Sequence, residues 1–167
     1  MKKVLVITYS QSGQLDEIVT NVLSQFSDEI QVHYEKLVPK PDFPFPWGGT
    51  SFWDAMPESV ELIPSSIKPV AFDLDEDYDL IILGYPIWFL SPAIPLTTFL
   101  KSKEAKKVMN GKPVVSIIGA RNMWVSAQEQ IKHMIDENGG KLVGNIALCD
   151  KHFNLTSVIT IIYWMMT

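Results

Sequence analysis

The chain has 167 residues, of which 47% are hydrophobic and 20% charged, and its formal net charge is −5 at pH 7. This length and composition predict one soluble domain over residues 1–167, because roughly 70% of the unfolded surface can be buried without a disulfide or metal. The acidic balance argues against a nucleic-acid partner. The single cysteine, Cys149, cannot form an intramolecular disulfide, and we expect it to be a buried structural residue. The apolar runs of the chain are too short for a signal peptide or a membrane span, which predicts a cytoplasmic protein.

Apolar runs and amphipathic segments alternate along most of the chain. The run Val-Leu-Val-Ile between Lys3 and Thr8 is continuously apolar, which is typical of a strand covered on both faces. Residues 13–25 have apolar side chains at helical spacing, which predicts a helix. Residues 30–37 alternate in polarity and predict an edge strand. Further strands are predicted at 80–84, 113–118 and 141–148, and helices at 92–101 and 124–138. This order predicts an α/β fold, a doubly wound parallel sheet of five strands with helices on both faces.

Residues 38–72 interrupt this alternation between the second and third predicted strands. This insertion contains most of the prolines and the aromatic residues Phe43, Phe45, Trp47, Phe52 and Trp53. A connection of this length is usually functional or disordered, and its aromatic content argues against disorder. Two interpretations remain open: plain covering of the sheet, or a lid or partner surface over a binding site.

Polar clusters give no sign of a metal site. The acidic run at residues 73–79 precedes a predicted strand and is typical of a solvated loop. The three histidines lie on different predicted elements and lack metal-ligand spacing. We therefore predict no metal.

Open parallel sheets bind ligands at the carboxyl ends of their strands, so the loops after the first, third and fourth predicted strands hold the candidate site residues. The first loop has hydroxyls and a glycine at the start of a helix, which makes a phosphate cradle without a lysine, or simply caps the helix. The second is stiffened by proline and offers aromatic surface for a planar ring, or ordinary core packing. The third has small residues that allow close approach of a ligand. The candidates are Ser10, Gln11, Ser12, Gly13, Gln14 and Leu15 in the first loop, Pro86, Ile87 and Trp88 in the second, and Gly119, Arg121, Asn122 and Trp124 in the third.

These loops and the segment Tyr-Asp-Leu-Ile-Ile-Leu-Gly-Tyr-Pro-Ile-Trp at residues 78–88 resemble the flavodoxin-like FMN proteins, especially their NAD(P)H-quinone reductase branch. The resemblance spans roughly residues 2–150 outside the insertion and implies the strand order 2-1-3-4-5. It also implies that residues 10–15 surround the FMN phosphate and that residues 86–88 lie along the isoalloxazine. Gly119, Arg121, Asn122 and Trp124 would close the other side of the ring. Leu15 departs from the pattern, because it stands where flavodoxins usually place a third hydroxyl.

The resemblance implies an FMN-dependent oxidoreductase in which NAD(P)H reduces the flavin and the flavin reduces a planar, apolar acceptor such as a quinone. Two other functions remain open: a flavodoxin-like electron carrier that docks to a partner protein, and a flavin-free accessory module in lipid or aromatic metabolite synthesis. The insertion resembles flavodoxin-like bacterial proteins labelled dialkylresorcinol condensing enzyme, although such a condensation normally needs an activated cysteine with histidine partners. Residues 156–167 are nearly all apolar and predict a helix buried against the sheet or in a homodimer.

Overall fold

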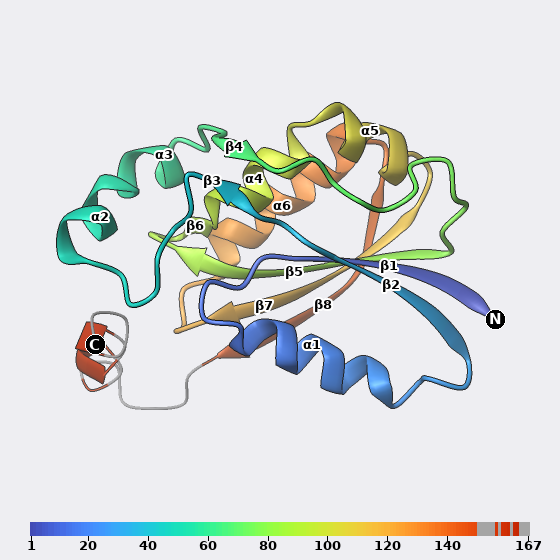
Figure 1. The fold of residues 1–167 in the computed structure, drawn as a ribbon, viewed down its shortest axis with the longest axis horizontal. Helices are drawn as coiled ribbons and strands as arrows, with labels where there is room; N and C mark the ends of the chain where they lie inside the picture. Colours follow the sequence, from blue (N-terminus) through green and yellow to red (C-terminus); the bar gives the residue numbers. More distant parts are fainter. Residues whose placement is uncertain (150–155, 157, 161, 164–167) are drawn as a thin grey trace.

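The computed structural model describes residues 1–149, 156, 158–160 and 162–163. Its central sheet runs in the order β2-β1-β5-β7-β8, and the short β6 pairs with β5 (Figure 1). The long strands, which all pair in parallel, are β1 (Lys2–Thr8), β2 (Ile30–Lys36), β5 (Leu80–Trp88), β7 (Pro113–Ala120) and β8 (Lys141–Cys149). Both the predicted α/β class and the predicted strand order are confirmed.

Helices cover both faces of the sheet. α1 (Gln14–Ser24) lies on one face, whereas α4 (Ile94–Leu100), α5 (Lys103–Met109) and α6 (Val125–Glu137) lie on the other (Figure 1). Helix α5 is absent from the sequence-based prediction. It begins after Ser102, whose hydroxyl accepts a hydrogen bond from the Ala105 N–H, and this cap separates α5 from α4.

Alternating side chains along the strands divide the core into two layers. Leu5 and Ile7 belong to the layer beneath α4, α5 and α6, whereas Val4 and Val6 pack against α1. Full burial of each such side chain contributes about 1.5 to 3 kcal/mol. At Gly84 a Cβ would lie 2.9 Å from Thr8 Cγ2, so glycine is needed there for β5, β1 and α1 to approach closely.

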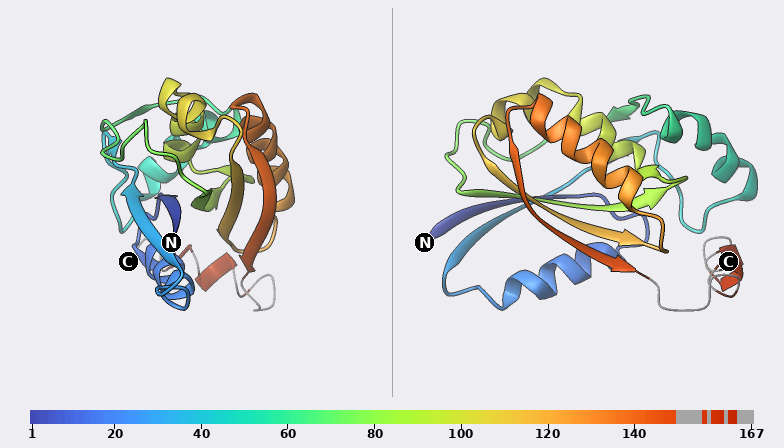
Figure 2. Two further views of the ribbon diagram at one scale, coloured as in Figure 1. Left: turned by 90° about the vertical axis from the view of Figure 1, so that its right-hand side faces the viewer. Right: turned by 180° about the vertical axis from the view of Figure 1, so that it is seen from behind.

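The helices of the insertion, α2 (Gly49–Asp54) and α3 (Met56–Val60), lie beyond the carboxyl ends of the strands (Figure 2, right). The insertion also contains the two-stranded ladder of β3 (Pro39–Lys40) and β4 (Ser66–Ile67). Trp47 is 1% exposed and belongs to the main core, whereas Trp53 is 60% exposed. The insertion therefore supplies part of the core and also reaches the end of the sheet where the candidate loops lie.

The acidic loop lies at the opposite end, beside the amino ends of β1 and β5. Asp79 pairs with Lys2 at 2.8 Å, and Glu76 pairs with Lys3 at 2.7 Å. The other two pairs are Asp75 with Lys107 and Asp77 with Lys112. This end of the sheet is thus exposed and charged, as predicted for a solvated loop.

The C-terminal part differs from the prediction at Cys149. Its side chain is exposed, not buried, because it ends the edge strand β8, which has a neighbouring strand on one side alone. The predicted helix at residues 156–167 falls largely outside the described residues, and of those that are described, Ile159 and Tyr163 are exposed. No helix in the described part of the chain has the length and hydropathy needed to cross a membrane.

Candidate functional site

The loop between β1 and α1 turns at Gly13, which has φ +84° and stands at the N-cap of α1. The Ser10 hydroxyl accepts a hydrogen bond from the Leu15 N–H at 3.1 Å, and the Ser12 hydroxyl accepts one from the Gln14 N–H at 3.5 Å. Two serine hydroxyls of the loop therefore accept hydrogen bonds from the first turn of α1, whereas the N-cap residue itself, Gly13, has no side chain to cap the helix.

The same loop also leaves room for an anion. A Cβ on Gly13 would have nothing within 4 Å, so open space lies in front of the turn. None of the described residues accepts a hydrogen bond from the backbone N–H groups of Ser12 and Gly13. Unused N–H groups at the positive end of a helix are what a phosphate requires, so the residues present fit the phosphate of a nucleotide cofactor.

The Leu15 side chain does not point into this space. It is buried between α1 and the sheet, and its Cδ1 would lie 3.6 Å from a Cβ on Gly119. The position where a third hydroxyl was expected therefore holds an apolar contact between α1 and β7. Leu15 contributes to the loop through its backbone N–H alone.

Trp88 ends β5 inside a group of aromatic rings. Its ring centre lies 4.7 Å from that of Trp47 and 5.0 Å from that of Phe43, both in the insertion. On another side, the ring of Tyr9, which directly follows β1, lies 5.5 Å away. Trp88 is 7% exposed, so in this structure its indole packs beneath the insertion and has no free face for a planar ligand.

A tight turn joins β5 to β6 (Ser91–Pro92). Its central residues, Phe89 and Leu90, have φ of +49° and +65°, a left-handed conformation that residues other than glycine rarely adopt. The Phe89 ring packs against Phe52 of α2, with ring centres 4.8 Å apart. Strained backbone of this kind tends to occur at functional sites.

A cavity of about 300 Å³ lies at the carboxyl ends of β5 and β7. Ile87, Arg121 and Asn122 line it, so the structure brings together predicted site residues from two loops. The lining residues that the sequence analysis missed are Phe52, Phe89, Leu90, Ala120, Met123, Val158 and Ile162. The last two belong to the few residues beyond β8 that the structure describes.

The remaining predicted residues do not line the cavity. Pro86 and Gly119 pair with each other across β5 and β7. Trp124 packs partly buried against the core beneath α4, α5 and α6. Gln14 is exposed at the start of α1.

Hydrogen bonds join the insertion to two of the candidate loops. Gln11 Nε2 donates to the Pro44 carbonyl at 2.9 Å, and the Ser59 hydroxyl donates to the Trp88 carbonyl at 3.1 Å. The insertion is therefore held beside two candidate loops, an arrangement that fits both plain covering of the sheet and a lid.

Two buried donors near Trp88 lack acceptors. The Tyr9 hydroxyl and the Trp47 indole N–H have no hydrogen-bond partner among the described residues. Leaving such a group unpaired costs about 1 to 3 kcal/mol, and buried polar groups in native proteins are nearly always paired. Burial, reinforced by the charge of Asp42, raises the pKa of Tyr9, so its hydroxyl stays protonated at neutral pH.

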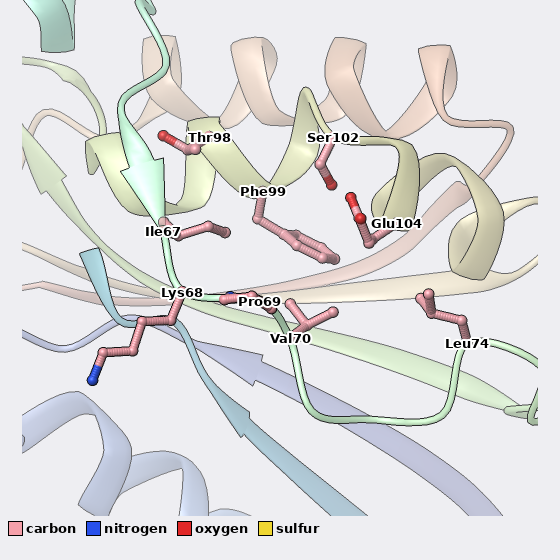
Figure 3. A pocket seen from close by; sticks show the side chains of 9 residues that line it. All are labelled: Ile67, Lys68, Pro69, Val70, Leu74, Thr98, Phe99, Ser102 and Glu104. Atoms are coloured by element: carbon pink, nitrogen blue, oxygen red, sulfur yellow. The ribbon is translucent and has the colours of Figure 1, made fainter. Parts of the chain in front are cut away.

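A second cavity, of about 350 Å³, lies between α4, α5 and residues 67–74 (Figure 3). None of the predicted site residues lines it. Its hydroxyls have local roles, because Thr98 accepts a hydrogen bond from the Ser65 N–H and Ser102 caps α5. Figure 3 shows the Lys68 side chain directed away from the cavity.

No family model and no curated protein matches the chain by sequence. Solved structures do match it. The FMN complex of a flavoprotein from Lactobacillus acidophilus NCFM aligns with 88% of this chain and 93% of its own, with a TM-score of 0.70 at 20% identity. The fold is flavodoxin-like.

Two further structures support the flavodoxin-like fold. A chain from Bacteroides eggerthii DSM 20697 aligns over 98% of both chains, with a TM-score of 0.68 at 15% identity. Oxidised flavodoxin 1 from Bacillus cereus aligns with 98% of this chain and 97% of its own, with a TM-score of 0.53 at 16% identity. At these identities the similarity concerns the fold alone.

Proposed function

We propose that this chain binds FMN and is an oxidoreductase in which NAD(P)H reduces the flavin and the flavin reduces a planar, apolar acceptor such as a quinone. The observation that carries the proposal is the open turn at Gly13, at the same edge of a flavodoxin-like sheet as the apolar cavity. The FMN bound by the Lactobacillus acidophilus flavoprotein, whose fold is similar, supports the choice of cofactor.

The protein's own residues would bind and orient the flavin and shield it from water. Residues 10–15 would surround the phosphate, with the unused backbone N–H groups of Ser12 and Gly13 as donors. Ile87, Arg121 and Asn122 would border the ring at the cavity. The layer behind the flavin ring would be formed by Pro86, Trp88, Gly119 and Trp124. Bound FMN would supply the hydride and electron transfer. Phe52 and Phe89 would exclude water from that end of the cavity.

The phosphate placement is tested by Gly13→Ala, with Gly111→Ala as the matched control. Both glycines have positive φ and open space at the Cβ position, but Gly111 lies in the turn before β7, at the charged end of the sheet. Each substitution should cost roughly 1 to 2 kcal/mol of stability. Gly13→Ala alone should raise the Kd for FMN by at least about tenfold, which corresponds to about 1.4 kcal/mol. FMN titration followed by flavin fluorescence measures this, and equal affinities for the two variants would contradict the placement.

The reaction is tested with the FMN-loaded protein. NADH or NADPH oxidation should require both the protein and an acceptor, with menadione and benzoquinone as probes. If the wild-type chain binds no FMN, the flavin-free accessory module becomes the better hypothesis.

One observation favours an electron carrier as a second candidate. Exposed apolar side chains surround the cavity at the carboxyl end of the sheet, namely Trp53, Leu90, Met123 and Val125. Such a patch also suits docking of a redox partner protein. A carrier would keep its FMN but show no NAD(P)H oxidation with menadione or benzoquinone.

A further inference from the structure

Among the described residues beyond β8, Val158 and Ile162 line the cavity at the carboxyl ends of β5 and β7. Both have helical backbone, as do their described neighbours. They are four residues apart, so in a helix their side chains lie on the same face, one turn from each other. One face of this turn therefore forms a wall of the cavity.

A second face of the same turn points to solvent. Ile159 and Tyr163 each follow a cavity-lining residue and are also four residues apart, and they are 62% and 69% exposed. Neither of them lines the cavity. Four uncharged side chains on one turn are thus sorted by direction, one pair toward the cavity and the other toward solvent.

The two cavity-lining side chains are β-branched and therefore stiff. In a helix, valine and isoleucine keep one strongly preferred χ1 rotamer, so Val158 and Ile162 present a fixed surface. Met123, which lines the same cavity, is unbranched and can adapt its shape to a ligand. A fixed surface discriminates by size, because no change of rotamer makes room for a larger molecule.

The cavity is small for its proposed contents. Its volume of about 300 Å³ is at the lower end of the range for small-molecule sites. Two of its other walls are held by backbone hydrogen bonds, since β6 pairs with β5 and the Trp124 N–H donates to the Asn122 carbonyl at 3.1 Å. The side chains of Val158 and Ile162 therefore decide how large a ring system fits beside the flavin.

We propose that Val158 and Ile162 are specificity-determining residues that limit the size of the ring system admitted to the cavity. The inference rests on the proposed function, in which a planar, apolar acceptor approaches the flavin there. It selects single-ring acceptors over larger fused-ring ones.

The test compares Val158→Ala and Ile162→Ala with Ile159→Ala and Tyr163→Ala, which are the matched controls on the exposed face. Alanine is the best helix former, so none of the four substitutions disfavours the helical backbone. With FMN-loaded protein and NAD(P)H, kcat/KM is measured for phenanthrenequinone, which has three fused rings, and for benzoquinone, which has one. The ratio of the two values should rise at least about tenfold in the cavity variants, because a methylene-sized change in an apolar pocket is worth about 10- to 200-fold. The controls should keep the wild-type ratio.

A substitution in the opposite direction tests the sign of the effect. Val158→Phe fills the cavity and should lower the same ratio by about tenfold. An equal rise in all four alanine variants would mean that the backbone beyond β8 loosens, and no change in any of them would mean that Val158 and Ile162 do not bound the site. Either result would overturn the proposal.

Ligand binding to the flavin-free protein separates this inference from the proposed function. Phenanthrenequinone is titrated into the flavin-free protein, and its Kd is measured by quenching of tryptophan emission. The Kd should fall by about tenfold in Ile162→Ala and stay at the wild-type value in Tyr163→Ala. If the wild type retains no FMN, the proposed function fails and this titration alone decides the inference, which equal Kd values for the two variants would refute.

Discussion

Phe89 and Leu90 occupy the central positions of the β5–β6 turn, where asparagine and glycine are the usual residues. A side chain at positive φ costs roughly 1 to 2 kcal/mol per residue. Both residues line the cavity, so the strain places apolar surface where a ligand would bind.

This strain predicts an unusual order of stability for substitutions at Leu90. Leu90 is 49% exposed, so truncating it removes little packing. Leu90→Gly relieves the backbone while Leu90→Ala does not, and the glycine variant should be more stable by about 1 kcal/mol. Urea denaturation of the two variants measures the difference. The ordinary order, with alanine more stable than glycine, would show that the turn is not strained.

The positions of candidate residues were easier to predict than the directions of their side chains. The loops at residues 10–15, 86–88 and 119–124 follow from the rule that ligands bind at the carboxyl ends of parallel strands. Whether Trp88 faces a ligand depends on Phe43 and Trp47, which come from an insertion with no regular pattern. Tyr9 directly follows β1 and could have been recognised from its place, whereas Phe52 and Ile162 carry no local signal.

At the scale of secondary structure, the regular elements other than α5 agree with the sequence and the irregular ones do not. The predicted strand at 80–84 continues to Trp88, because residues 85 and 86 still pair with β7. Pro86 has no N–H to donate, which made this segment resemble a loop. The helices of the insertion are too short to show a periodic pattern, so α2 and α3 could not be predicted.

The insertion is expected to contribute unequally to stability. Trp47 is almost fully buried, so Trp47→Ala should cost about 3 to 5 kcal/mol. Trp53 lies six residues further along the same segment and is mostly exposed, so Trp53→Ala should cost less than about 1 kcal/mol. Chemical denaturation of both variants tests this. Similar small losses for both would mean that the insertion is a detachable lid rather than part of the core.

At the scale of the whole molecule, the two ends of the sheet have opposite character. Lysine–carboxylate pairs cluster at the amino ends of the strands, whereas exposed apolar side chains gather at the carboxyl ends. Exposed ion pairs are worth little individually, so they contribute mainly solubility. The apolar end is where ligands or partners are expected.

The charged end predicts a pH dependence through Asp79. Hydrogen bonds from the Lys2 ammonium and the Lys3 N–H hold the pKa of Asp79 below its ordinary value of 3.8. A carboxylate with a depressed pKa stabilises the fold at pH values above its ordinary pKa. This contribution is lost as the pH falls through the lower pKa of the folded state. Asp79→Asn should therefore be less stable than the wild type near pH 7, and the difference should shrink as the pH falls below 3.8. Denaturation measured at pH values above and below 3.8 tests this, and a pH-independent difference would contradict it.

The hydrogen bond from Gln11 to the Pro44 carbonyl joins the turn before α1 to the insertion. A molecule that fixes the turn in this conformation also favours the present position of the insertion. By thermodynamic reciprocity, an occupant that fixes the insertion must strengthen binding at the turn by the same factor. Two ligands that share no contact residue would thus bind cooperatively, and one side-chain amide would transmit the coupling.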